Sequence, residues 1–140
     1  MTTETDYWHR LRKKLKGRVY TWKINANYVA GVPDAWLSGH QQDLWVENKR
    51  VATETPPPSL DLTDHKKYLT VLQQKWLEDR YAEGRHVAVI VFSKIGHLLL
   101  FGLEWKKPIS RLSFMERAVS MDELAEELVE ILGERSKIAP

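Results

Sequence analysis

The sequence predicts a mixed α/β fold in which helices flank a central sheet. Three observations predict it: a helical apolar pattern near the N-terminus, a continuous apolar run over 87–92, and a capping box that starts a closing helix at Ser120. Strand patterns alternate with these helical patterns along the chain, which is typical of α/β architecture. A chain of 140 residues can bury one ordinary core, so we expect one domain over residues 1–140.

The N-terminal half predicts one helix and three strands. Tyr7, Trp8, Leu11 and Leu15 recur at helical spacing in a helix over 5–16, and Gly17 follows its end. Alternating apolar residues then predict strands that are separated by turn residues. These strands are expected over 18–24, 28–32 and 44–51, with a turn at 31–34.

The C-terminal half predicts two helices and a strand pair. A helical face over 70–83 stops at Gly84. The run over 87–92 is typical of a strand that is covered on both faces, and it is expected to pair as a hairpin with a strand over 98–105. The closing helix carries Leu124, Leu128, Ile131 and Leu132 on one stripe.

Composition excludes several classes of protein. Hydrophobic residues make up 43% and charged residues 29%, close to the globular average. No apolar run approaches the roughly 18 residues that a membrane span requires, and charges stand where a secretory signal needs an apolar segment. Cysteine is absent, which excludes disulfides and thiolate metal sites. We therefore expect a cytoplasmic protein with no membrane partner.

Charge is segregated along the chain although the net charge is only +2. Acids crowd the closing helix, whereas a basic stripe without acids lies near the N-terminus. Each Lys or Arg that meets a phosphate releases condensed counterions, so this stripe is a candidate nucleic-acid-binding surface. A merely solvated face is the alternative. The stripe consists of Arg10, Arg12, Lys13, Lys14, Lys16, Arg18 and Lys23.

A charged pair interrupts the apolar strand over 44–51. Because side chains alternate across a strand, Trp45, Glu47 and Lys49 point to the same face. An unpaired buried charge costs on the order of several kcal/mol, so the pair needs a partner. Asp34 can supply one if the two strands are antiparallel neighbours. The alternative is a surface ion pair, with Asp34 serving only as a turn residue.

Two converging carboxylates would form a hard-oxygen metal site. Asp34 and Glu47 suit Mg²⁺ or Mn²⁺, with the backbone carbonyl of Asn48, waters and a substrate phosphate as further ligands. A bound cation neutralises the phosphate and lowers the pKa of a coordinated water. Lys49 can hold that water or neutralise charge that develops on phosphorus. These residues predict a centre that hydrolyses phosphodiesters.

The same residues carry a family resemblance. Gly31-Val32-Pro33-Asp34 followed by Glu47-Asn48-Lys49 resembles the PD-(D/E)XK nuclease signature. The stretch from Leu69 to Leu77, with Gly84 and the strand at Val87 after it, is similar to VRR-NUC domains of the small phage-encoded type. Together these segments cover about residues 4–100.

The resemblance implies a restriction-endonuclease-like core that uses Mg²⁺ or Mn²⁺ and acts on DNA. It assigns metal binding to Asp34 and Glu47 and catalytic assistance to Lys49. It also assigns a role to Gln73, although Thr70 and Gln73 fit a capping box as well. In related domains a further acid often comes from the first helix. Glu4 and Asp6 are both candidates here, and an acid in a helix's first turn is also commonly there for the macrodipole.

The expected function is that of a metal-dependent DNA endonuclease. By analogy, it would act as a homodimer on branched DNA such as a Holliday junction, as a phage protein in the cytoplasm of a bacterial host. The alternatives are a nuclease on single-stranded DNA, flaps or general duplex, and a non-catalytic nucleic-acid-binding protein of the same fold. A proline-rich insertion over about 52–68 departs from the family pattern and could contact DNA or a second subunit.

Tryptophan is abundant, with six residues in this small chain. A single-stranded substrate could use Trp8, Trp22, Trp36 and Trp45 to stack on unpaired bases. Burial in the core is the more ordinary expectation for these residues.

Overall fold

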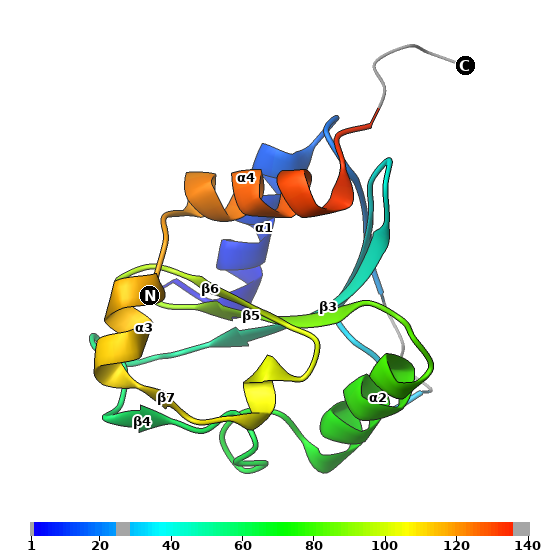
Figure 1. Cartoon of the computed structure of the whole chain (residues 1–140). Helices are drawn as coiled ribbons and strands as arrows, with labels where there is room; N and C mark the ends of the chain where they lie inside the picture. Colours follow the sequence, from blue (N-terminus) through cyan, green and yellow to red (C-terminus); the bar gives the residue numbers. More distant parts are fainter. Residues whose placement is uncertain (1, 25–28, 136–140) are drawn as a thin grey trace.

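The computed structural model describes residues 2–24 and 29–135, which form helices around two sheets (Figure 1). The helices are α1 (Glu4–Leu15), α2 (Val71–Ala82), α3 (Arg111–Arg117) and α4 (Met121–Leu132), with the 3₁₀ turn η1 at Glu104–Lys106. The strands are β1 (Tyr20–Lys23), β2 (Ala35–Ser38), β3 (Asp43–Arg50), β4 (Ser59–Leu60), β5 (Val87–Phe92), β6 (Leu98–Phe101) and β7 (Ile109–Ser110).

The central sheet is mixed and has the strand order β1-β2-β3-β5-β6. β3 and β5 run parallel and are connected through α2, whereas the other neighbouring pairs are antiparallel. A second, two-stranded sheet pairs β4 with β7. The predicted fold class, a mixed sheet flanked by helices, is therefore confirmed.

Two apolar cores lie on opposite faces of the central sheet. α1 and α4 cover one face, where Trp8, Leu11 and Leu128 pack against strand residues such as Val46 and Ile90. α2, the small sheet and α3 cover the other face (Figure 1). All six residues of β5 are buried, as their continuous apolar run predicted, because both layers press on this central strand.

Three helices begin with capping boxes, two of which, at Thr70 and Ser120, the sequence predicted. Thr3, Thr70 and Ser120 each accept the backbone N–H of the residue three positions later, and each receives the reciprocal side-chain contact. The helices expected over 5–16 and 70–83 are thus present within one residue at each end. No helix among the described residues is long and apolar enough to cross a membrane.

The second strand lies later in the chain than expected. The strand predicted over 28–32 is wrong for residues 29–32, which form a turn, and Tyr28 lies outside the described residues. β2 follows Asp34 instead, because Ala35 and Leu37 alternate into the core while their neighbours face away. Asp34 therefore precedes this strand and does not end one.

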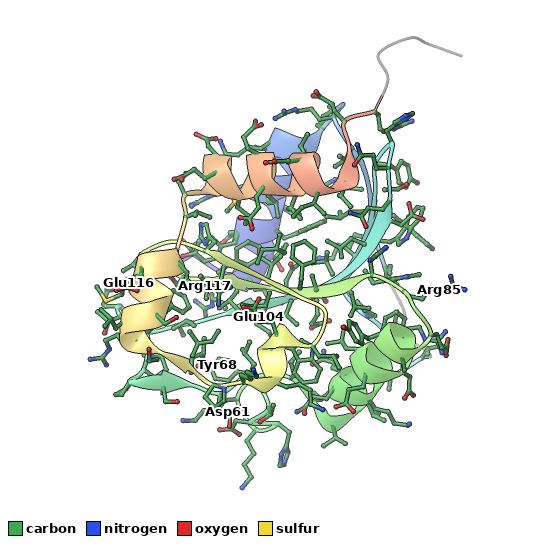
Figure 2. All side chains as sticks on the ribbon, viewed as in Figure 1. Asp61, Tyr68, Arg85, Glu104, Glu116 and Arg117 are labelled. Atoms are coloured by element: carbon green, nitrogen blue, oxygen red, sulfur yellow. The ribbon has the colours of Figure 1, made fainter. Side chains whose placement is uncertain are left out.

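The C-terminal half holds short elements that the sequence did not reveal. The strand expected over 98–105 stops at Phe101, because Gly102 adopts φ +59° and turns the chain into η1. α3, β4 and β7 were not predicted. Figure 2 shows Glu104 of η1 near Arg117 of α3, and their side chains form an ion pair of 2.8 Å that ties these short elements together.

The proline-rich insertion packs against the sheet. It contains β4, and its Leu60 and Leu62 are fully buried in the core on the α2 side. The side chain of Arg111 donates to the carbonyl of Pro56 at 2.7 Å, and the Arg111 backbone N–H donates to the carbonyl of Pro58 at 3.1 Å. Parts of this segment therefore help to build the second layer of the fold.

Candidate active site

Asp34 and Glu47 are brought together by the pairing of β2 with β3. Ala35 pairs with Val46 in this antiparallel ribbon, so Asp34 and Glu47 are the next opposing positions. On its other side, Asp34 continues the pairing of β1 with β2, since the Ile24 N–H donates to the Asp34 carbonyl at 2.8 Å. Opposing residues of an antiparallel pair project from the same face, so both carboxylates reach the same side of the sheet.

Glu47 is a buried carboxylate that is held by two donors. It is 2% exposed, and its Oε2 accepts from Gln73 Nε2 at 3.0 Å and lies 3.2 Å from Lys49 Nζ. Burial, and then the nearby Asp34 carboxylate, raise the pKa of Glu47 to about 8. A second negative charge beside Asp34 is therefore costly in this buried place unless a cation balances it.

Gln73 closes the predicted capping box and also contacts Glu47. Its Oε1 accepts the backbone N–H of Thr70 at 2.9 Å, which closes the capping box of α2. Its Nε2 remains free to reach Glu47. The start of α2 is thus fixed over β3 by the same side chain that orients the carboxylate.

At the end of the β2–β3 pairing, the side chain of Asp34 takes the place of a backbone hydrogen-bond acceptor. Its Oδ2 accepts the backbone N–H of Asn48 at 2.8 Å. Gly31 supports the preceding turn with φ +86°, and a Cβ at that position would lie only 2.5 Å from the Leu72 carbonyl oxygen. The turn therefore packs closely on the first turn of α2, which fixes Asp34 relative to Gln73.

The structure distinguishes the two acids of the first helix. Asp6 is exposed and closes the capping box of α1, where its Oδ2 accepts the Thr3 N–H at 2.9 Å. Glu4 instead faces the site: burial and then the Asp34 carboxylate raise its pKa, whereas Lys49 lowers it. Glu4 is therefore the acid that extends the charged cluster.

The start of α1 is attached to the end of β3. Arg50 Nη1 donates to the Thr2 carbonyl oxygen at 2.9 Å. This contact explains how an acid from the N-terminus reaches residues that lie more than forty positions later in the chain.

The donor set fits a divalent cation that takes part of its shell from water and substrate. Glu47 Oε1 is buried and has no hydrogen-bond partner among the described residues, while Oε2 has two. An acceptor without a donor in a negative surrounding is suited to a cation. Within residues 2–24 and 29–135, no three His, Cys, Asp or Glu side chains form a ready metal cluster. The remaining ligands would be backbone, water and phosphate oxygens.

Some residues of the basic stripe form ion pairs with acids in the structure, and others do not. Lys14 forms an ion pair with Asp122, and Arg18 pairs with Glu126 and, at 2.8 Å, with Glu134. The acid-rich helix that is distant in sequence is therefore adjacent in space, and it neutralises part of the stripe. The guanidinium of Arg10 lies 5.7 Å from the ring centre of its neighbour Tyr7.

The other basic residues are exposed. Arg12, Lys13 and Lys16 line a cleft of about 540 Å³ that also includes Tyr20. Lys23 lies on β1, close enough to the acid cluster to lower the pKa of Glu4. These four residues remain candidates for contact with a phosphate backbone.

Four of the six tryptophans lie in the apolar cores or pack against them, as the more ordinary expectation had it: Trp8, Trp105, Trp45 and Trp76. Trp8 and Trp105 are fully buried, whereas Trp22 is 52% exposed and the other three are partly exposed. Trp36 and Trp45 oppose each other across β2 and β3, two residues before the carboxylate pair on β3. Period-two alternation placed Trp45 on the face of Glu47, but the position of Trp36 required the true start of β2.

These features define the class of the fold as restriction-endonuclease-like. The structure is similar to that of Hjc, a Holliday junction resolvase from the archaeal hyperthermophile Archaeoglobus fulgidus. The TM-score is 0.56, and the match covers 86% of this chain and 98% of that chain at 14% sequence identity. No protein-family model and no curated protein match this sequence. At this identity the likeness establishes the fold, and the resemblance to VRR-NUC domains stays a prediction.

Proposed function

We propose that this protein is a metal-dependent DNA endonuclease. The observation that carries the proposal is the position of Glu47: its carboxylate opposes Asp34 on the neighbouring strand and contacts both Lys49 and Gln73. A fold has no structural need for a buried carboxylate with a raised pKa, so such groups are concentrated at functional sites. Similarity to the fold of a Holliday junction resolvase supports the same reading.

Each residue of the site has a chemical role in this proposal. Asp34, Glu47 and the Asn48 carbonyl would hold Mg²⁺ or Mn²⁺, and Glu4 would add negative charge. A divalent ion in such a site supplies charge neutralisation for a phosphate and lowers the pKa of a bound water. Lys49 donates a hydrogen bond to the attacking water or to a phosphate oxygen.

Gln73 acts through Glu47. Its amide fixes one carboxylate oxygen, which leaves the other for the cation. Because the same amide side chain caps α2, the orientation of the ligand is coupled to the rigid helix.

We infer a structure-selective activity on branched DNA, with a homodimer presenting two such sites to a four-way junction. Arg12, Lys13, Lys16 and Lys23 would contact the phosphate backbone. A nuclease on single-stranded DNA or flaps is the second candidate, and the exposed tryptophans next to the site favour it. A non-catalytic DNA-binding protein would not need a buried Glu47 in contact with Lys49.

A cleavage panel tests the proposal. Duplex, fork, flap, single-stranded and four-way substrates are incubated with Mg²⁺ or Mn²⁺, and parallel reactions contain EDTA. Symmetric nicking of the four-way substrate that EDTA abolishes is the expected result. Cleavage that survives EDTA contradicts a carboxylate-metal site, and random nicking of linear duplex contradicts structure selectivity.

Two lysine variants separate catalysis from binding. Lys49→Ala is expected to bind the substrate but to cut it at least about 100-fold more slowly, because one electrostatic contact in the transition state is typically worth that much. Lys106→Ala is the matched control, since Lys106 is an exposed lysine on η1 that pairs only loosely with Glu78, at 3.6 Å. Equal cutting by Lys49→Ala and wild type would remove Lys49 from the mechanism.

A further inference from the structure

A row of aromatic side chains crosses the sheet on the face of the candidate site. The aromatic row consists of Trp22 on β1, Trp36 on β2, Trp45 on β3 and Trp76 on α2. Trp22 opposes Trp36, and Trp36 opposes Trp45, in the strand register. The rings of Trp36 and Trp45 lie 6.3 Å apart, and Trp76 meets Trp45 edge-on at 5.3 Å.

The exposed end of the aromatic row is not needed to complete a core. Trp22 is 52% exposed, and Tyr20, which meets the edge of Trp36 at 6.0 Å, is 47% exposed. α1 and α4 cover the opposite face of β1 and β2, while α2 covers the sheet only from β3 onward. Grouped aromatic surface of this kind is typical of a binding site.

Guanidinium groups accompany the row. The side chain of Arg80 lies 5.6 Å from the ring centre of Trp76, and Arg135 lies 5.9 Å from that of Tyr20. Arg85 and His86 line a cleft of about 590 Å³ together with the three strand tryptophans. Figure 2 shows Arg85 projecting outward after α2. Aromatic rings beside Arg groups are suited to stacked bases and their phosphates.

One acid stands beside the cleft among the described residues that line it. It is Asp43, and its Oδ1 accepts from the Ser38 hydroxyl at 2.6 Å. A second copy of this chain, docked face to face, would bring Arg80 and Arg85 toward their own counterparts. The charge pattern therefore favours a polyanion over a self-association surface.

The row is adjacent to the carboxylate pair. Trp36 and Trp45 each lie two residues from Asp34 and Glu47 along their strands, on the same face. Two residues of a strand span about 7 Å. A nucleotide whose phosphate is at the acids can therefore place neighbouring bases on the tryptophans, provided that those bases are not paired.

We propose that the aromatic row binds unpaired nucleobases beside the scissile phosphodiester, so that the substrate carries single-stranded nucleotides on one side of the cleavage point. The position of the scissile bond rests on the proposed nuclease function, whereas the binding of bases does not. An open branch point and a single-stranded flap both supply such nucleotides.

Binding is measured first in EDTA, so that cleavage plays no part. Fluorescence anisotropy compares a labelled 12-nucleotide oligo-dT strand with a labelled duplex of the same length. Trp22→Ala is expected to bind the single strand at least about fivefold more weakly, which is the lower end of the effect of losing one stacked base. The ratio of single-strand to duplex affinity should fall accordingly. Trp22→Phe is expected to keep most of the single-strand affinity, because a ring remains.

Two further variants control for nonspecific effects and for misfolding of Trp22→Ala. Leu112→Ala changes a 68% exposed apolar side chain on α3 and is expected to leave the affinity ratio unchanged. Arg85→Glu alters the same cleft without touching a strand and is expected to weaken single-strand binding, which tests the proposal even if Trp22→Ala is poorly folded. Unchanged single-strand affinity in Arg85→Glu and in a folded Trp22→Ala overturns the proposal.

Cleavage then separates this proposal from the nuclease function. If Trp22→Ala selectively loses cutting of flaps and forks, both stand. If no substrate is cut but Trp22→Ala loses single-strand binding, the nuclease function fails and the base-binding row stands. If Trp22→Ala instead converts a dimer to a monomer at unchanged single-strand affinity, the row is a subunit contact and the proposal is wrong.

Discussion

Replacing Glu47 with Gln should stabilise the protein at neutral pH. The substitution keeps the size of the side chain and an oxygen that can accept from Gln73, but it cannot ionise, so it removes the cost of holding a proton that the unfolded chain releases. Proteins commonly keep destabilising groups where function needs them. A gain in stability when such a group is replaced indicates a functional role.

The magnitude follows from the pKa of Glu47. Its ordinary value of 4.5 rises to about 8 in the folded protein. Between these values the folded state retains a proton that the unfolded chain releases, so the free energy of unfolding falls as pH rises. From pH 4.5 to pH 7 this amounts to 2.5 pKa units, or about 3 kcal/mol at 1.36 kcal/mol per unit. The Glu47→Gln variant cannot ionise at this position and therefore does not lose this free energy of unfolding.

Urea denaturation at pH 4.5, 6, 7 and 8 without divalent ions measures the effect. Wild type and Glu47→Gln should be similar at pH 4.5, and the variant should gain up to about 3 kcal/mol by pH 7. Glu116→Gln is the control, because Glu116 is an exposed acid on α3 (Figure 2). A difference between wild type and Glu47→Gln that stays constant across pH would refute the reasoning. Millimolar Mn²⁺ should raise the melting temperature of wild type and leave that of Glu47→Gln unchanged.

Three further predictions follow from the structure. Gly31→Ala should cost about 1–3 kcal/mol in urea denaturation and reduce cleavage, since φ +86° and the Leu72 carbonyl at 2.5 Å both exclude a Cβ; wild-type stability would contradict the packing. Burial lowers the pKa of His97 to about 4, so the contribution of His97 to stability should fall as pH drops from 6.5 toward 4, opposite in sign to that of Glu47; an NMR titration midpoint near 6.5 would disprove this. Arg12→Ala should weaken DNA binding and reduce its salt dependence more than Arg18→Ala, whose side chain is occupied by acids; the reverse order would reject the surface assignment.

The sequence predicted those parts of the site that depend on local rules. Alternation along one strand was enough to put Glu47 and Lys49 on the same face, and the capping box was enough to start α2 at Thr70. Both rules involve residues within a few positions of one another. Their geometry is therefore independent of the rest of the fold.

Features that depend on distant contacts were not predictable in the same way. The choice between Glu4 and Asp6 required the contact of Arg50 with Thr2, which joins opposite ends of two elements. The pairing of β4 with β7 links segments about fifty residues apart, and each strand is too short to show a pattern. No local sequence pattern predicts such pairings.

The basic stripe shows the same limit for charge. Its seven residues are uninterrupted in sequence, yet Lys14 and Arg18 pair with acids more than a hundred positions later. Charge segregation describes only the order of charged residues along the chain. Which of these charges remain available to a ligand depends on the contacts that the fold creates.

Anomalous diffraction from crystals soaked in Mn²⁺ tests the central claim most directly, because it locates the ion without relying on activity. The account predicts a peak between the carboxylates of Asp34 and Glu47, which should be absent from crystals of Glu47→Gln. An ion bound elsewhere in wild type, or a peak that persists at the same position in Glu47→Gln, would contradict a metal centre built on the β2–β3 acid pair.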